Sequence, residues 1–362
     1  MLDAVVSQPD DSQQVTAGPA EALVAVDAMG GDHAPEEIVA GAVAAVRDKS
    51  AQVVLTGRPG QLRPLLARHG MADIRVVAAD DSLAMDEGAL ASWRRPRSSI
   101  AIACQLVHRG QATAVMSAGS TGGIVATARL RLRLLPGVMR PALAVVLPTQ
   151  PGPTLLIDAG AIADPKPEML VQFAQLGVAY AQTALRIAEP RVGLLTIGAE
   201  PAKGNKLARR AHELLESDPP HGGMPFSFTG NIEGGDLLAG RVDVVVTDGF
   251  TGNVALKTLE GAAEFAGRQF LATLTATRTA RLGAFLQRRG LTELTQRLDS
   301  ESYGGAALLG LEGTVVIAHG AVTARGAAAA CALAASLASG QITERIKERL
   351  GPQRGGHFLR RP

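Results

Sequence analysis

The feature that most constrains this chain is a repeated alternation of short apolar runs with longer stretches of helical character. Most runs are rich in β-branched residues and show no apolar/polar alternation, which is typical of strands buried on both faces. Stretches rich in Ala and Leu, such as residues 37–49 and 167–187, are long enough for crossover helices. The pattern predicts a doubly wound, Rossmann-like α/β/α sandwich around a parallel sheet. The runs lie at residues 23–29, 51–57, 74–79, 113–119, 142–148, 154–160, 191–198, 226–232, 242–249 and 313–320.

Many of these runs end in a polar side chain close to a glycine. Ligands of open parallel sheets bind outside the carboxyl ends of the strands, so we expect these side chains to converge on one site. Glycine allows the backbone to approach a ligand closely, although for any single run it can simply turn the strand into a helix. The polar residues are Asp27, Ser117, Asp158, Thr196, Asn231, Asp248 and His319, and the accompanying glycines include Gly30, Gly31 and Gly119.

Two of the loops that follow these runs have the composition of anion sites. In the stretch 117–128, glycines surround Ser120 and Thr121 at a predicted helix start, which favours anion binding by N–H groups. In the stretch 197–215, Lys203 and Asn205 precede another predicted helix and could hold a phosphate. Neither loop has the spacing of a Walker loop, and neither a dinucleotide fingerprint nor a G-x-S-x-G elbow occurs.

Composition excludes several classes of protein. A net charge of +2 and 3% aromatic residues argue against a nucleic-acid binder. Cys104 and Cys331 have no partners at metal-ligand spacing, and so few cysteines suggest a reducing cytoplasm. We expect no metal and no cofactor, and the scattered histidines read as ordinary surface residues. These histidines are His33, His69, His108, His212 and His221.

The ends of the chain and one internal stretch differ from the rest. Residues 1–21 lack the basic start and apolar centre of a signal peptide and read as a disordered leader, and 349–362 reads as a disordered basic tail. Residues 22–348 then form a single domain. Within it, residues 264–298 read as a helical arm that leaves the sheet and packs against a second subunit in a homodimer. The arm carries Arg278, Arg281, Arg288 and Arg289 between apolar positions.

An ordered series of long motifs resembles the PlsX family, the phosphate acyltransferases of bacterial phospholipid synthesis. Among them are "VAVDAMGGDHAPEEIVAGA", "SAGSTGGIVA", "RVGLLTIGAEPAKGN" and "GNIEGGDLLAGRVDVVVTDGFTGNVALKTLEG", and the resemblance runs from about Leu23 to Lys347. It implies a fold similar to phosphate acetyltransferases and isocitrate dehydrogenases. It also implies transfer of a long-chain acyl group from acyl carrier protein to inorganic phosphate, which gives acyl phosphate for glycerol-3-phosphate acylation.

The resemblance further implies partners and a location. Acyl carrier protein is acidic, so a local basic face would steer it, and residues 93–97 and the arginines of the arm are candidates. We expect a cytoplasmic protein that can lie at the inner face of the plasma membrane. There it could contact the downstream glycerol-3-phosphate acyltransferase.

In the mechanism that the resemblance implies, phosphate attacks the thioester carbonyl directly. Lys203, Asn205 and the glycine cradle would hold phosphate, and Asn231 would donate to the developing oxyanion. Asp248 would either orient Lys203 or accept a proton. The remaining substrate-binding residues are predicted to be Asp27, Gly30, Gly31, Ser117, Gly119, Ser120, Thr121, Gly122, Asp158, Lys166, Glu233, Gly252, Asn253, Lys257 and His319.

The sequence departs from the family pattern at some positions and leaves other functions open. Ser120 and Ile162 stand where relatives usually carry Asn, and only Glu200 remains of a usual pair of acids. A short-chain acetyl- or butyryltransferase that uses coenzyme A is an alternative with the same fold. A non-catalytic scaffold at the membrane surface, bound through the arm, is a second alternative.

Overall fold

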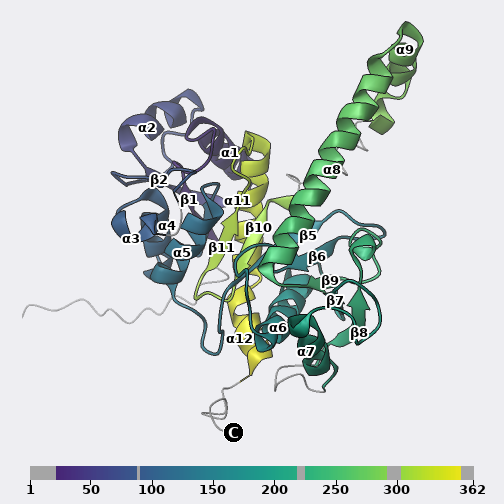
Figure 1. Cartoon of the computed structure of the whole chain (residues 1–362). Coiled ribbons are helices and arrows are strands. Elements are labelled where there is room, and N and C mark those ends of the chain that lie inside the picture. The colour runs from purple at the N-terminus through teal and green to yellow at the C-terminus, as the bar shows by residue number, and fades with distance from the viewer. Residues whose placement is uncertain (1–21, 88–89, 218–224, 292–302, 352–362) are drawn as a thin grey trace, which may run out of the picture.

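One eleven-stranded sheet runs through the protein, in the order β3-β2-β1-β4-β11-β10-β5-β6-β9-β7-β8. The computed structural model describes residues 22–87, 90–217, 225–291 and 303–351 (Figure 1). The strands are β1 Leu23–Asp27, β2 Gln52–Gly57, β3 Val76–Ala78, β4 Ala114–Ser117, β5 Ala142–Leu147, β6 Thr154–Ile157, β7 Arg191–Leu195, β8 Ser227–Ile232, β9 Val244–Val246, β10 Ala306–Leu309 and β11 Thr314–Ile317.

Helices cover both faces of this sheet, which confirms the predicted α/β/α sandwich. The helices are α1 Glu36–Arg47, α2 Pro59–Arg68, α3 Ala91–Arg94, α4 Ser99–His108, α5 Thr121–Leu132, α6 Pro167–Thr183, α7 Lys206–Glu216, α8 Gly249–Thr275, α9 Arg278–Leu286, α11 Ala324–Ser339 and α12 Ile342–Leu350. Among the described residues, no single helix is long and apolar enough to cross a bilayer; α11 and α12 pass that test only together, as a pair bent by 50°.

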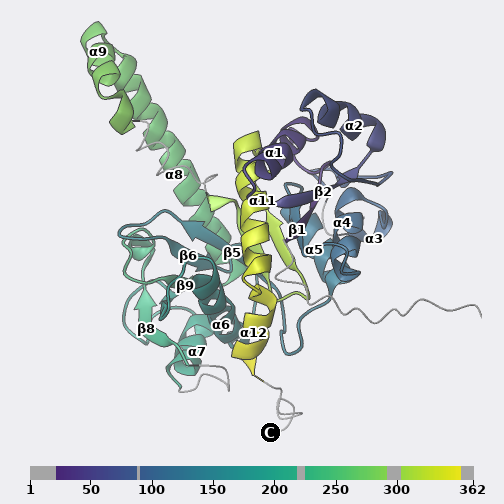
Figure 2. The same cartoon turned by 180° about the vertical axis from the view of Figure 1, so that it is seen from behind.

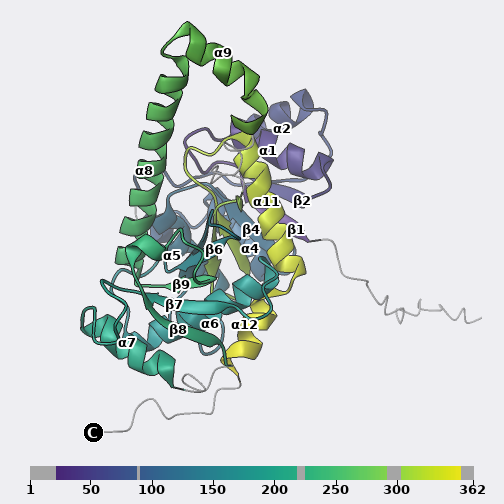
Figure 3. The ribbon, with the colours of Figure 1, turned by 90° about the vertical axis from the view of Figure 1, so that its right-hand side faces the viewer.

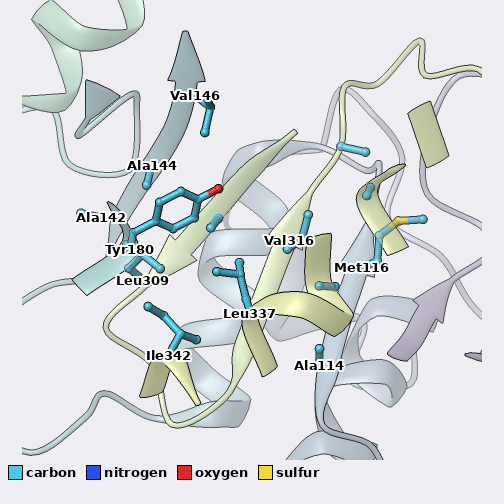
Figure 4. Packing of buried hydrophobic residues seen from close by; sticks show 14 of the residues in the cluster. Ala114, Met116, Ala142, Ala144, Val146, Tyr180, Leu309, Val316, Leu337 and Ile342 are labelled. Atoms are coloured by element: carbon cyan, nitrogen blue, oxygen red, sulfur yellow. The ribbon is translucent and has the colours of Figure 1, made fainter. Parts of the chain in front are cut away.

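Alternate residues of the central strands supply two separate hydrophobic cores. In β4, Met116 faces one core with α1, α6, α11 and α12, whereas Val115 faces the other with α4 and α5. Figure 4 shows part of the first core, where Tyr180 and Val316 are among the buried side chains. Because both faces of each strand are buried, the sequence shows continuous apolar runs rather than alternation.

The sheet is mixed, whereas most of the apolar runs were expected to form a parallel sheet. β5 pairs antiparallel with β6 and β10, and β10 also pairs antiparallel with β11. All other pairs are parallel. β10 was not predicted at all, because its sequence, Ala-Ala-Leu-Leu, has no β-branched residue.

Close helix packing holds the middle of the molecule together. α11 crosses the centre of the sheet beside α1, as seen from behind in Figure 2. A Cβ at Gly41 of α1 would lie 2.6 Å from the carbonyl oxygen of Ala324, so only glycine permits this approach. The N–H of Ala324 also donates to Oε2 of Glu37 at 2.6 Å, which joins the two helix starts.

The arm leaves the sheet as predicted but begins earlier. α8 starts at Gly249, directly after β9, and continues without a break to Thr275 before the chain turns into α9 (Figures 1 and 3). The side chains of Phe265, Leu271 and Phe285 on this arm are about 60% exposed. The last part of the predicted arm, 292–298, lies outside the described residues.

The predicted leader also lies outside the described residues, as does most of the predicted tail. The tail begins later than expected, because α12 extends to Leu350 and the side chain of Arg349 is buried. The Arg349 guanidinium donates to Oε1 of Gln175 at 3.1 Å and to the carbonyl oxygen of Pro225 at 3.0 Å. Arg349 therefore belongs to the folded domain.

Candidate active site

The directions of the strands divide the polar strand ends into two groups. β1, β4 and β11 run opposite to β6, β7, β8 and β9, because the antiparallel strands β10 and β5 lie between them. The carboxyl ends of the two sets therefore lie at opposite ends of the strands, on opposite sides of the sheet. The expectation that all of these residues converge on one site is wrong, since it assumed a parallel sheet.

The first group is built around a buried pair of polar side chains. Oγ of Ser117, at the end of β4, donates to Oδ2 of Asp27, at the end of β1, over 2.7 Å. The N–H of Gly119 donates to the same Oγ at 3.2 Å. A Cβ at Gly30 would lie 2.7 Å from Oδ2, so the loop can pass the carboxylate only as glycine. Burial raises the pKa of Asp27, and the hydrogen bond from Ser117 acts against this rise. The pair therefore fixes the loops that follow both strands.

The predicted glycine cradle forms the start of α5. Oγ of Ser120 accepts from the N–H of Gly123 at 3.4 Å, and the same hydroxyl lies 3.2 Å from the carbonyl oxygen of Glu87. Thr121 and Gly122 are exposed in the first turn. The first N–H groups of a helix have no partner within the helix, so this exposed start can bind an anion.

His319 borders the same loops after β11. Its side chain is exposed, and its Nδ1 accepts from the N–H of Ala321 at 3.3 Å. Gly31 has a φ of +116°, which L-residues rarely adopt, and the next N–H, of Asp32, donates to the carbonyl oxygen of Gly320 at 2.8 Å. Loops from β1, β4 and β11 thus meet at this edge.

The second group contains a carboxylate enclosed by backbone donors. Oδ1 of Asp158 accepts from the N–H groups of Leu143, Gly160 and Ala161 at 2.9, 3.1 and 2.9 Å, and Oδ2 accepts from that of Ile162 at 2.7 Å. Burial raises the pKa of Asp158, and these donors oppose the rise because they favour the ionised form. Asp158 therefore organises the loop after β6, although it was predicted to bind substrate.

The start of α8 packs directly on that loop. Asp248 is the N-cap of α8, where its Oδ1 accepts from the N–H of Thr251 at 2.8 Å. A Cβ at Gly252 would lie 1.9 Å from the carbonyl oxygen of Asp158, so this predicted site glycine is needed for packing. Asp248 is partly exposed and keeps an oxygen beyond the capping contact.

Three other predicted polar residues lie near the same loop. Asn253 approaches Gly160, where a Cβ would lie 3.5 Å from its Oδ1. Lys257 is exposed and forms an ion pair with Glu260 at 2.7 Å. Lys166 is exposed at the N-cap position of α6, where its side chain makes no capping hydrogen bond.

The turn between β7 and α7 carries Lys203, the cation that was predicted to bind phosphate. Lys203 is exposed, its N–H donates to the carbonyl oxygen of Glu200 at 3.0 Å, and its aliphatic stem crosses Gly198. A Cβ at Gly198 would lie 2.8 Å from Cγ of Lys203, which explains the glycine. Asn205 is the N-cap of α7, where its Oδ1 accepts from the N–H of Ala208 at 2.8 Å. A cation and a helix start therefore lie together.

Asn231, on β8, holds this turn through a hydrogen bond. Its Nδ2 donates to the carbonyl oxygen of Glu200 at 2.8 Å, and its Oδ1 lies 2.8 Å from Nδ1 of His212. The side chain of His212 is 3% exposed, so the prediction of a surface histidine is wrong. Nothing in a single histidine on a helix signals such a partner. Asn231 and Lys203 share one carbonyl oxygen and belong to one site.

Glu233 lies two residues beyond Asn231 and has a local structural contact. Its side chain and that of Asp236 cap each other's backbone N–H groups around the short helix Gly234–Asp236. Among the described residues, no group of three or more potential metal-binding side chains occurs. The exposed cation, the helix start and the buried amide at the ends of β7 and β8 can bind an anion and polarise a carbonyl.

Comparison with known proteins identifies the family. The chain matches the family described as "Fatty acid synthesis protein" over residues 22–345. It is 61% identical to a "Phosphate acyltransferase" of Thermobifida fusca over 343 residues, which cover 94% of each chain. The chain belongs to the PlsX family. A "Phosphate acyltransferase" of Thermus thermophilus is 45% identical over 90% of this chain and 98% of the relative. A PlsX member is an acyltransferase, and this excludes the non-catalytic scaffold as the function of the whole chain.

Solved structures show the same fold at low sequence identity. A phosphotransacetylase from Streptococcus pyogenes superimposes with a TM-score of 0.61 at 17% identity and covers 88% of this chain and 94% of its own. A phosphotransacetylase from Staphylococcus aureus gives a TM-score of 0.57 at 14% identity, with coverage of 88% and 94%. The likeness to phosphate acetyltransferases that the motifs of this PlsX chain implied is confirmed for the fold.

Proposed function

We propose that this acyltransferase moves a long-chain acyl group from acyl carrier protein to inorganic phosphate. The product is an acyl phosphate for phospholipid synthesis. Membership of the PlsX family supports this reaction, and the turn that joins Lys203 to the start of α7 is the observation that carries it, since it offers a cation and N–H donors to a phosphate.

In the proposed reaction a phosphate oxygen attacks the carbonyl carbon of the thioester. A C–O bond forms, the C–S bond breaks, and the thiol of the carrier leaves as a thiolate that takes up a proton. Lys203 neutralises part of the phosphate charge. Asn231 donates one Nδ2 hydrogen to Glu200 and has a second one for the developing oxyanion.

Asp248 and the polar residues around α8 complete the proposed site. The free oxygen of Asp248 accepts a proton from phosphate or orients a cation, while Asn253 and Lys257 line the start of α8. The start of α5, with Ser120 and Thr121, is a second proposed anion site. It lies on the opposite side of the sheet, at the carboxyl ends of β1, β4 and β11. We propose no cofactor.

Acyl carrier protein is the proposed donor, and its acidic surface needs a basic partner surface. In the stretch 93–97, Arg95 pairs with Asp81 and Glu87 at 2.7 Å each, and Arg97 pairs with Asp80 at 2.9 Å. Much of the local charge is therefore already neutralised. We propose that the arginines of the arm contribute more to steering the carrier.

The arm is also the basis of the proposed assembly and location. Its exposed apolar side chains would be covered in a homodimer, or would enter the headgroup region as a peripheral membrane contact. We propose that the protein is cytoplasmic and acts at the inner face of the plasma membrane. Contact there with the downstream glycerol-3-phosphate acyltransferase would pass on the acyl phosphate.

A trapping assay tests the proposed function. Purified protein is incubated with phosphate and long-chain acyl-acyl carrier protein, and acyl phosphate is captured by hydroxylamine. We expect hydroxamate that depends on phosphate, with little product from acetyl- or butyryl-coenzyme A. Product without phosphate would contradict the reaction, and a preference for short-chain coenzyme A esters would support the alternative donor.

A further inference from the structure

The buried imidazole of His212 lies directly behind the proposed catalytic turn. His212 is in the second turn of α7, on the apolar face that also carries Ala211, Leu214 and Leu215. Its ring packs edge-on against Phe228 of β8, with 5.3 Å between ring centroids and 70° between ring planes. In this position Nδ1 of the ring faces the side chain of Asn231.

The hydrogen bonds of Asn231 determine which nitrogen of His212 carries a proton. A backbone carbonyl oxygen can only accept, so the atom of Asn231 that faces the carbonyl oxygen of Glu200 must be Nδ2. Oδ1 of Asn231 must then face Nδ1 of His212 at 2.8 Å. Because Oδ1 is also only an acceptor, Nδ1 of His212 must be the donor.

The other ring nitrogen has a different environment. Nε2 lies 3.2 Å from Oε1 of Glu216, one helical turn further along α7. The geometry of this approach does not qualify as a hydrogen bond, and Nε2 has no other hydrogen-bond partner among the described residues. Among the described residues, the bond from Nδ1 to Asn231 is therefore the hydrogen bond that orients the ring.

This bond is the first link of a series that ends at the backbone N–H of Lys203. His212 donates to Asn231, and Asn231 donates to the carbonyl oxygen of Glu200. The same carbonyl oxygen accepts the N–H of Lys203 at 3.0 Å. Loss of the first donor would leave Oδ1 of Asn231 buried without a partner and would release its amide to rotate.

We propose that His212 is a positioning residue that acts through Asn231 on the turn carrying Lys203. Its Nδ1–H selects the amide orientation in which Nδ2 of Asn231 holds Glu200, and this keeps the Lys203 turn in the conformation that binds phosphate. His212 itself need not touch the substrate. The inference rests on the proposed function for its kinetic consequence, whereas the tautomer follows from the hydrogen bonds alone.

Two substitutions of the full chain test the proposal kinetically. His212→Leu removes the donor and keeps an apolar side chain, and we expect a rise of about tenfold in the KM for phosphate, the effect of one lost buried hydrogen bond. His212→Asn can present an amide N–H near the position of Nδ1, and we expect it to recover most of the phosphate affinity. Glu216→Gln is the matched control on the same helix, and its KM should stay within about twofold of the wild type.

The pattern of kinetic constants separates positioning from a loss of folded protein. Partial unfolding lowers the apparent kcat and leaves the KM for phosphate unchanged, whereas a displaced Lys203 turn raises the KM. A wild-type KM in folded His212→Leu would overturn the proposal. An equal rise in KM for the Leu and Asn variants would also overturn it, because the N–H would then not matter.

Nitrogen NMR of ¹⁵N-histidine-labelled wild-type protein gives a readout that does not need activity or the Leu variant. We expect the His212 signal to show a protonated Nδ1, and a lone pair at Nδ1 would overturn the proposal even if His212→Leu fails to fold. If the wild type forms no acyl phosphate while Nδ1 is protonated, the proposed function fails and the hydrogen-bond assignment stands. The two failures are therefore distinguishable.

Discussion

At the scale of single residues, the structure separates side chains that can meet a substrate from side chains that hold loops. Lys203 is exposed and has its aliphatic stem over Gly198, whereas Asp158 is buried with both carboxylate oxygens occupied by backbone N–H groups. Both were predicted as site residues because each follows a strand and lies near glycine. Composition cannot distinguish them, since the difference lies in which backbone donors the loop turns inward.

The role of Lys203 predicts a specific kinetic defect. Lys203→Ala removes the cation nearest the proposed phosphate, so we expect the KM for phosphate to rise by about tenfold to a hundredfold, with a lower kcat. Steady-state rates over a range of phosphate concentrations measure this. Lys203→Arg should keep part of the affinity because it keeps the charge. Lys347→Ala, which removes an exposed cation of α12, is the control, and unchanged phosphate saturation in Lys203→Ala would remove Lys203 from the site.

The role of Asp158 predicts a defect in stability. Asp158→Asn replaces one acceptor oxygen by an NH2 group that must face a backbone N–H, and we expect the free energy of unfolding to fall by about 2 to 4 kcal/mol. Urea unfolding followed by circular dichroism measures this change. Asp164→Asn alters an exposed carboxylate in the same loop and should change the stability by less than about 0.5 kcal/mol. Equal stabilities of the two variants would contradict the role of Asp158.

At the scale of helices and strands, the sequence predicted most elements and missed one that matters. Buried strands such as β4 and β9 show continuous apolar runs, so they were found from the sequence. β10 was missed, because Ala and Leu favour helices, and only pairing with β5 and β11 makes it a strand. Because β10 was missed, the reversal of strand direction in the sheet was not predicted. The separation of the strand ends into two groups, which follows from this reversal, was therefore not predicted either.

The apolar side chains of the arm are left exposed to solvent in a single chain. Beyond its first turns α8 is exposed on all sides, and in the described residues its apolar side chains Phe265, Phe270 and Leu271 pack against no core cluster. We expect a homodimer at micromolar concentration in light scattering. Leu271→Asp should weaken the dimer at least about tenfold without lowering the melting temperature of the domain.

The control for the arm is a charge introduced at an exposed apolar residue elsewhere. Leu90 is 76% exposed and lies far from the arm in sequence, so Leu90→Asp should leave the dimer intact. A wild-type monomer with an intact arm would contradict the proposed assembly. A dimer that persists in Leu271→Asp would show that another surface forms it.

At the scale of the whole molecule, two half-sheets are joined by the last strands of the chain. One half contains β3, β2, β1 and β4, and the other contains β5, β6, β9, β7 and β8. β11 pairs with β4, and β10 pairs with β5, so these two strands fill the gap between the halves. The helices α11 and α12, which follow them, then cover the joint.

This order of assembly has a consequence for protein synthesis. The ribosome releases the N-terminus first, so both half-sheets emerge with an open strand edge, β4 on one and β5 on the other, before the strands that close them exist. A chain that stops at residue 302 should therefore aggregate on expression, whereas one that stops at residue 351 should remain soluble. A soluble, monodisperse product from the shorter chain would show that each half can protect its own edge. Until the final strands arrive, the nascent enzyme is two unfinished sheets that need shielding from each other and from neighbouring chains.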